Sequence, residues 1–288
     1  MALPLEDSFL PGDVRLDGVA AGHFSGGGSG TGNSDYVVYG KRGKGAGDGG
    51  DYLATFRGGP GDIGCYHDVL SDGGARTTRS LATGDVDKDG TTDLVTGEPA
   101  DGRGGGGSVT VRWGAPDGLG TGRKPVAYDQ STPGVPGTDE KGDRFGAAVS
   151  VRDVTCDGYA DIAVGVPSEA VRGTDAGAVV LLKGSAGGVS ATGAQTFDQE
   201  ATGVPGAAED GDRFGSGVHL ADVGKDGKGD LFGAAGGEDI GTVPDVGAVW
   251  VLRGASSGLT TTGVTSFNGA DFGFTGTAGL HFGEVFDH

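Results

Sequence analysis

Hydrophobic residues in this chain occur in short runs, and glycine-rich segments separate one run from the next. Within runs such as residues 145–154 (FGAAVSVRDV) and 177–185 (GAVVLLKGS), apolar residues either alternate with polar ones or follow one another directly. Both patterns are typical of half-buried or fully buried β-strands of roughly four to eight residues. No stretch shows apolar residues at the spacing of a helical face. The pattern therefore predicts an all-β chain.

The chain also repeats itself. The run that begins at Tyr128 aligns without a gap with the run that begins at Phe197, an offset of 69 residues. Three further segments, GSVTVRWGAPDGLG, GAVVLLKGSAGGVS and GAVWVLRGASSGLT, are copies of one another. Each unit contains four strand-like segments, and four strands per unit repeated along a chain are the signature of β-propeller blades.

We predict a single β-propeller domain, or a fragment of one, over residues 1–288. Because the last segment duplicates the strand type that opens a blade, an incomplete ring is favoured over a four-bladed ring closed by a tail strand. The expected blades cover residues 14–76, 77–143, 144–211 and 212–280, and residues 281–288 (HFGEVFDH) begin a further blade strand.

The segment DVDKDGTTD at residues 85–93 places four carboxylates in one short loop. Carboxylates this close repel one another unless a cation lies among them. Gly90 relieves the backbone at the sharpest point, which lets alternate oxygen atoms converge. Hard oxygen ligands in a flexible loop favour Ca²⁺ over Mg²⁺ and over transition metals. The expected ligands are the side chains of Asp85, Asp87, Asp89 and Asp93 and the carbonyl of Thr91.

Two further copies of this loop carry fewer carboxylates, and the charge count ranks their calcium affinity after that of the first loop, in chain order. In the last copy Gly224 offers no side-chain oxygen, so a water would have to substitute. The expected ligands are Asp153, Thr155, Asp157, Asp161 and the carbonyl of Tyr159 in one copy, and Asp222, Asp226, Asp230 and position seven, Lys228, in the other.

An incomplete copy near the N-terminus has His23, Ser25 and Asp35 where the loop at 85–93 has Asp85, Asp87 and Asp93. We expect this copy to bind no metal. An alternative interpretation applies to all the copies: the aspartates could form Asx-turns, in which a carboxylate caps backbone N–H groups of a tight β-connection. Under the calcium interpretation, Asp93→Ala weakens the best site most.

The charge composition limits the classes of binding partner that we expect. Aspartate and glutamate outnumber lysine and arginine 40 to 21, so nucleic acid and anionic membrane surfaces are poor partners, whereas cations are good ones. No run of about 18 apolar residues predicts insertion into a membrane. The start, MALPLEDSFLPG, has neither a basic nor an apolar signal region. Cys65 and Cys156 lack metal-type spacing, and their redox state stays open.

These residues resemble the FG-GAP repeats of the integrin α-chain β-propeller and of bacterial secreted relatives. Phe145-Gly146 and Phe214-Gly215 match the FG half, Gly165-Val166-Pro167 matches the GAP half, and the aspartate loop lies between the halves. The resemblance covers residues 77–288 well and residues 14–40 poorly. It implies a propeller with calcium loops on one face, a protein partner on the other, and an extracellular or cell-surface location.

No catalytic constellation can be assembled from the sequence: there is no GxSxG motif, and no two histidines have metal-ligand spacing. We therefore expect a non-catalytic extracellular binding or adhesion module with a protein or glycan partner. The alternative is a lectin-like or substrate-holding domain of a larger secreted enzyme.

Overall fold

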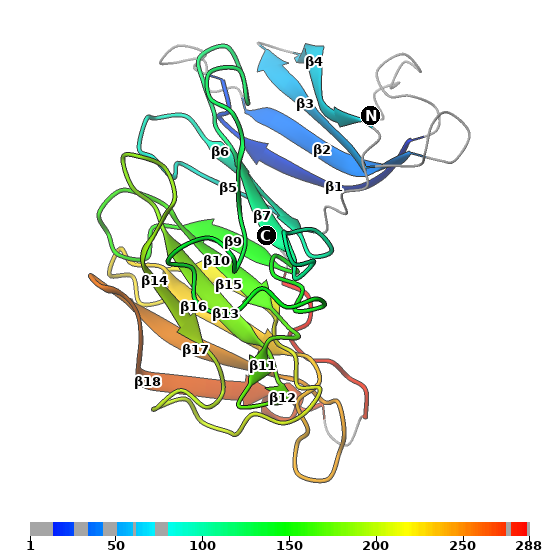
Figure 1. Ribbon diagram of the computed structural model, residues 1–288, viewed down its shortest axis with the longest axis vertical. Coiled ribbons are helices and arrows are strands. Elements are labelled where there is room, and N and C mark those ends of the chain that lie inside the picture. The colour runs from blue at the N-terminus through cyan, green and yellow to red at the C-terminus, as the bar shows by residue number, and fades with distance from the viewer. Residues whose placement is uncertain are drawn as a thin grey trace.

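The computed structural model describes residues 14–25, 34–42, 51–59, 62–72, 80–274 and 278–286. These residues form four four-stranded antiparallel sheets, which we call blades 1 to 4, and one short 3₁₀ helix, η1 (Gly269–Phe272). The prediction of an all-β chain built from four-stranded blades is confirmed. The blades follow one another in sequence order from top to bottom of Figure 1.

Within every blade, the strands hydrogen-bond in an up-and-down arrangement. Each blade lies inside one of the four repeat units expected from the sequence. Blade 1 contains β1 (Val14–Gly22), β2 (Asp35–Arg42), β3 (Asp51–Gly59) and β4 (Asp62–Asp72); blade 2 contains β5 (Ser80–Gly84), β6 (Asp93–Glu98), β7 (Ser108–Arg112) and β8 (Val126–Tyr128). Blade 3 contains β9 (Val149–Arg152), β10 (Asp161–Val166), β13 (Ala178–Lys183) and β14 (Ser190–Phe197), with a small hairpin of β11 (Ala170–Val171) and β12 (Thr174–Asp175); blade 4 contains β15 (Phe214–Ala221), β16 (Asp230–Ala235), β17 (Ala248–Ala255) and β18 (Gly258–Asn268).

The first strands of all four blades face one common groove. Val19, Leu81, Val149 and Val218, one from each first strand, line it together. This is the arrangement of propeller blades around an axis, in which the first strand of each blade is innermost.

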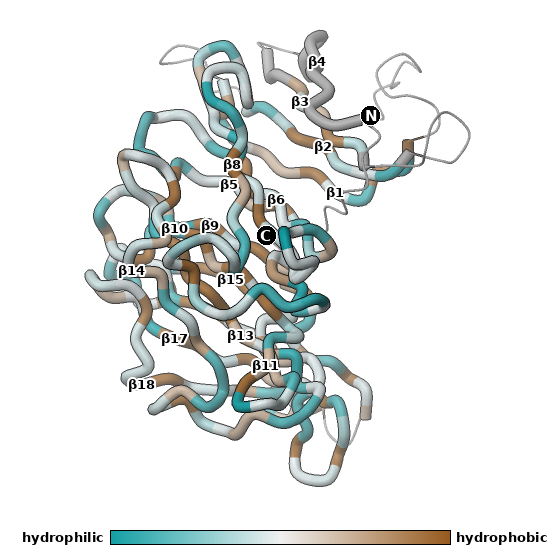
Figure 2. Tube along the Cα trace, viewed as in Figure 1, coloured by the Kyte–Doolittle hydropathy of each residue, from teal (hydrophilic) through white to brown (hydrophobic). Residues whose placement is uncertain are grey.

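The hydrophobic core lies between neighbouring blades. Every residue of β10 is buried, and its near-continuous apolar run packs on both faces of the sheet. Trp113 and Trp250 are both buried, and the ring of Trp250 meets that of Phe214 edge-on at 5.5 Å. Figure 2 shows the apolar segments along the strands and the polar ones mainly in the connecting loops.

The FG and GAP halves meet across the seams between blades. A Cβ added at Gly165, in the GAP half of blade 3, would lie 2.0 Å from the carbonyl oxygen of Gly215, in the FG half of blade 4. Gly97 of blade 2 approaches the carbonyl oxygen of Gly146 of blade 3 equally closely. Glycine is required at these places because two backbones touch where a side chain would stand.

Replacing Gly165 by alanine should therefore lower the free energy of unfolding by about 1–3 kcal/mol, the usual cost of overpacking a close contact. Urea denaturation measures this. Gly122→Ala is the matched control, because a Cβ at Gly122 meets only the Ala115 methyl group at 3.6 Å. Equal denaturation midpoints for the two variants would show that the seam yields without strain.

The described part of the C-terminal segment, residues 278–286, forms turns and no strand. Its backbone nevertheless makes the same hydrogen bond to the preceding blade that residues at the start of blades 3 and 4 make. The Phe282 N–H donates to the Val246 carbonyl (2.8 Å), as the Phe145 and Phe214 N–H groups donate to the preceding blade (both 2.7 Å). Residues 287 and 288 lie outside the described residues, and the start of a further strand stays a prediction.

Candidate metal centre

The loop at residues 85–92 connects the first two strands of blade 2, and several of its backbone N–H groups donate hydrogen bonds to its own aspartate side chains. The Asp85 carboxylate accepts hydrogen bonds from the N–H groups of Asp89 (3.1 Å) and Gly90 (3.0 Å). Asp89 accepts from the N–H (2.8 Å) and the hydroxyl (2.5 Å) of Thr91, which is buried at the end of the loop. Gly90 has φ of +89°, a left-handed conformation that permits this tight turn.

Three carboxylates converge in this loop. One oxygen each from Asp85, Asp87 and Asp89 lie within 4.8 Å of one another, and no other such group occurs among the residues that the structure describes. Burial, and then the charges of Asp89 and Asp85, raise the pKa of Asp87. The Oδ1 atom of Asp87 is buried and makes no hydrogen bond within the described part of the chain. A buried acceptor without a donor, beside two further carboxylates, is an environment that a bound cation satisfies.

Asp93, the fourth expected ligand, is placed differently. It opens β6, is fully buried and lies outside the group of three. Its Oδ2 accepts the N–H of Val86 and its Oδ1 accepts the N–H of Gly114, both at 2.9 Å. Burial raises the pKa of Asp93 to about 7, although these two hydrogen bonds oppose the shift. Asp93 thus ties the loop, β6 and the end of β7 together, and its role as a calcium ligand stays a prediction.

The loop at residues 153–161 repeats this frame with fewer carboxylates. Asp153 accepts backbone N–H groups from Thr155 to Gly158, including Cys156 at 2.7 Å and Gly158 at 2.8 Å. Asp161 accepts the N–H groups of Val154 and Gly184, both at 3.0 Å, and burial raises its pKa to about 6. The Tyr159 N–H donates to Asp157 (2.9 Å).

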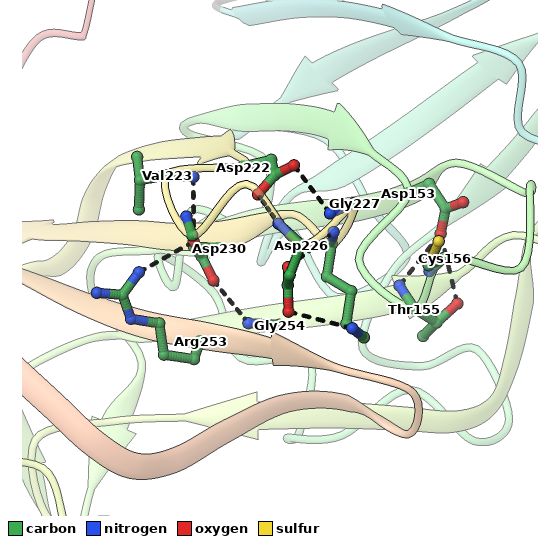
Figure 3. A network of polar contacts seen from close by, with 12 residues as sticks. Asp153, Thr155, Cys156, Asp222, Val223, Asp226, Gly227, Asp230, Arg253 and Gly254 are labelled. Atoms are coloured by element: carbon green, nitrogen blue, oxygen red, sulfur yellow. Dashed lines mark hydrogen bonds and ion pairs between the residues drawn. The ribbon is translucent and has the colours of Figure 1, made fainter.

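Two aspartates of the loop at residues 222–230 pair with cationic side chains, and Figure 3 shows Arg253 of β17 beside Asp230. The Lys228 ammonium pairs with Asp226 at 3.1 Å, and the Arg253 guanidinium pairs with Asp230 at 3.2 Å. The hydrogen bond from Lys228 lowers the pKa of Asp226. Two of the three aspartates are therefore paired with cationic side chains, and the calcium ranking of the loops stays a prediction.

In the incomplete first copy, Asp35 still opens β2 as Asp93 opens β6. Its carboxylate accepts the N–H (2.9 Å) and the hydroxyl (2.8 Å) of Ser25. This contact repeats the frame of the later loops, while His23 and Ser25 stand where Asp85 and Asp87 stand in the sequence of the next loop. The absence of metal there stays a prediction. The Asx-turn interpretation describes the hydrogen bonds of these loops correctly, but it leaves the buried Oδ1 atom of Asp87 unexplained.

The loops of successive blades are joined to each other, which the sequence analysis did not anticipate. The carbonyls of His23, Asp85 and Asp153 accept N–H groups from the next blade's loop, those of Thr92, Ala160 and Gly229 respectively, at 2.8–3.0 Å. All three donors occupy the same loop position, because Thr92, Ala160 and Gly229 each lie seven residues after the residue that matches the acceptor in the alignment of the repeats. Lys88 also reaches across, and its ammonium donates to the Asp157 carbonyl at 2.7 Å.

A second repeated contact involves a partly buried glutamate and a glutamine, and the sequence pattern did not predict it. Gln130 donates to Glu169 (2.5 Å) and Gln199 donates to Glu238 (2.7 Å), so the contact recurs at the seam between blades 2 and 3 and at the seam between blades 3 and 4. Burial, and then the charge of Asp212, raise the pKa of Glu238 to about 7. Burial raises the pKa of Asp212 to about 6. The signal was present in the gapless alignment, where Gln130 matches Gln199, but glutamine alone indicates no chemistry.

Sheets of this kind, repeated around a common groove with acidic loops between their first two strands, define a propeller-type repeat protein. The FG-GAP repeat family model matches residues 77–111 and 145–182, the first three strands of blade 2 and the corresponding part of blade 3. The chain therefore contains FG-GAP repeats, as the sequence predicted.

A search of the curated proteins found no match to this chain. Among the described residues, no helix is long and apolar enough to cross a membrane.

Proposed function

We propose that this chain is a non-catalytic, calcium-binding propeller module that serves extracellular adhesion or ligand binding. The observation that carries the calcium part is the convergence of Asp85, Asp87 and Asp89 around the unpartnered Oδ1 atom of Asp87. These three side chains would hold the ion, with further oxygens from the loop. Calcium would supply positive charge among the three converging carboxylates, so its role is structural.

The binding part of the proposal rests on the FG-GAP repeats and on the acidic composition. Integrin-type propellers with these repeats engage protein partners. Both tryptophans of the chain, Trp113 and Trp250, are only 2 % exposed, so neither offers a surface platform for stacking a sugar. This favours a protein partner over a glycan. A glycan array tests the choice: saturable saccharide binding would replace the proposed partner class with a lectin function.

Thermal unfolding of the chelator-stripped protein tests the calcium proposal. A ligand at 100 times its Kd stabilises the native state by about 2.7 kcal/mol, which corresponds to a rise in Tm of roughly 5–10 °C for a chain of this size. We expect this rise with calcium and a smaller one with magnesium. Asp87→Asn should remove most of the calcium-dependent rise. It should leave the metal-free Tm unchanged or higher, because the relief of burial and of repulsion by Asp85 and Asp89 offsets the loss of the partly exposed ion pair with Arg123.

Asp117→Asn is the matched control, because it removes one exposed carboxylate from the same blade outside the group of three. If calcium shifts the Tm of Asp87→Asn as much as that of the unmodified protein, the proposed site is wrong. If calcium shifts no variant at all, the loops are structural turns only.

A further inference from the structure

One cationic side chain stands at the proposed calcium site. Arg123, from the segment between β7 and β8, brings its guanidinium Nη1 to 3.3 Å from Asp87 Oδ2. The Asp87 side chain is 13 % exposed and that of Arg123 is 43 % exposed. The ion pair therefore lies at the rim of the loop, where water reaches the arginine but scarcely the aspartate.

Arg123 is held by two further contacts that do not involve the loop. Its guanidinium stacks on the buried indole of Trp113, 3.8 Å from the ring centroid. Its Nη2 donates a hydrogen bond to the carbonyl of Gly187, which belongs to blade 3. The arginine thus connects the acidic loop of blade 2 to blade 3. If its ion pair with Asp87 is broken, the contacts with Trp113 and with the Gly187 carbonyl remain.

Among the described loops of blades 2 to 4, only the loop at 85–93 pairs with an arginine from the segment between the third and fourth strands; in the loop at 222–230, Asp230 pairs instead with Arg253 of β17. The segments of blades 3 and 4 that correspond to residues 114–128 contain no lysine or arginine between residues 185 and 194 or between residues 255 and 266. In the loop at 85–93, the guanidinium covers Oδ2 of Asp87 and leaves Oδ1 without a partner. One positive charge on one oxygen does not satisfy three converging carboxylates, so the arginine and a metal ion would compete for the same aspartate.

We propose that Arg123 is a resident counter-cation that lowers the calcium affinity of the loop at 85–93 and exchanges Asp87 with the bound ion. This inference rests on the proposed calcium function. Without calcium, Arg123 pairs with Asp87 and ties the loop to blade 3. When calcium takes Asp87, the guanidinium stays on Trp113 and on the Gly187 carbonyl, and its charge repels the ion. Removal of that charge should tighten calcium binding.

Calorimetric titration of calcium into the chelator-stripped full chain tests this. We expect Arg123→Gln, which keeps a hydrogen-bond donor near Gly187, to lower the calcium Kd about five-fold or more, as one nearby partly screened charge would. Lys124→Ala is the matched control: it removes one positive charge from the next, exposed residue and should change the Kd less than two-fold. Arg123→Lys should keep a Kd near that of the unmodified protein.

Tryptophan fluorescence supplies an independent readout. Calcium should change the Trp113 emission of the unmodified protein, because the guanidinium stacked on the indole stays in place but loses its ion pair with Asp87, and it should change that of Arg123→Gln much less; Trp250 contributes a constant background. An unchanged or higher Kd for Arg123→Gln, with the unmodified protein binding calcium, overturns the role of Arg123 alone. If neither protein binds calcium, both the role of Arg123 and the proposed function fall.

Discussion

Substitution of Asp93 by alanine should lower the free energy of unfolding by about 2–5 kcal/mol even when no calcium is present. The carboxylate is fully buried and accepts two backbone N–H groups, those of Val86 and Gly114. Each buried donor left without an acceptor costs about 1–3 kcal/mol. The substitution also separates three segments that this side chain holds together, so the loss arises from the blade itself.

Urea denaturation in chelator measures the loss. Asp89→Ala is the informative control, because Asp89 is exposed and its hydrogen bonds stay within the loop, to Thr91. It should leave the metal-free stability nearly unchanged and reduce only the calcium-dependent part. If Asp93→Ala and the unmodified protein denature together in chelator, Asp93 acts solely as a metal ligand, as the sequence pattern had assigned it.

The stability of the calcium-free protein should increase as the pH falls from about 8 to about 5, opposite to the usual behaviour of carboxylates in folded proteins. Burial raises the pKa values of Asp93 and Glu238 to about 7 and those of Asp161 and Asp212 to about 6. In the unfolded chain these groups return to values near 4. The native state therefore binds more protons between these limits, and its stability is lost as the pH rises through 6 to 7.

Each proton taken up on folding contributes a slope of about 1.4 kcal/mol per pH unit. Calcium reverses the trend at the loops, because it binds ionised carboxylates and stabilises most at high pH. Melting curves at pH 5, 6, 7 and 8, in chelator and in excess calcium, should therefore converge at pH 5 and separate at pH 8.

Glu238→Gln provides the control for this prediction, because it removes one titrating group that follows the opposite end of β16 from the expected ligand Asp230, and it should flatten the slope in chelator. Protonation at low pH also reduces the overall negative charge, and this raises the stability of both proteins alike. The difference in pH slope between Glu238→Gln and the unmodified protein therefore reports the contribution of Glu238. A Tm in chelator that rises from pH 5 to pH 8 would contradict the assigned pKa shifts.

The sequence by itself determined the strands and the loops, because both are local patterns. The apolar run of β10 predicts a buried strand wherever it is placed, and the spacing of Asp85, Asp87 and Asp89 brings their carboxylates together within one turn. The gapless alignment of the third and fourth units likewise predicted blades of one kind. The strand and loop patterns depend on residues within about ten positions of each other, and the alignment compares only the letters of two segments, so none of them requires knowledge of how the blades pack.

Only the tertiary structure decided how these pieces act on each other. Arg123 lies 36 residues from Asp87, and Gly114 lies 21 residues from Asp93, so neither contact follows from loop spacing. Asp93 accordingly occupies the position of a ligand in the sequence pattern, but in the structure it is buried and accepts hydrogen bonds from two backbone N–H groups. The physical reason is that burial and hydrogen bonding come from strands brought together by the seams between blades, and those surroundings decide whether a carboxylate faces an ion, a backbone N–H or an arginine.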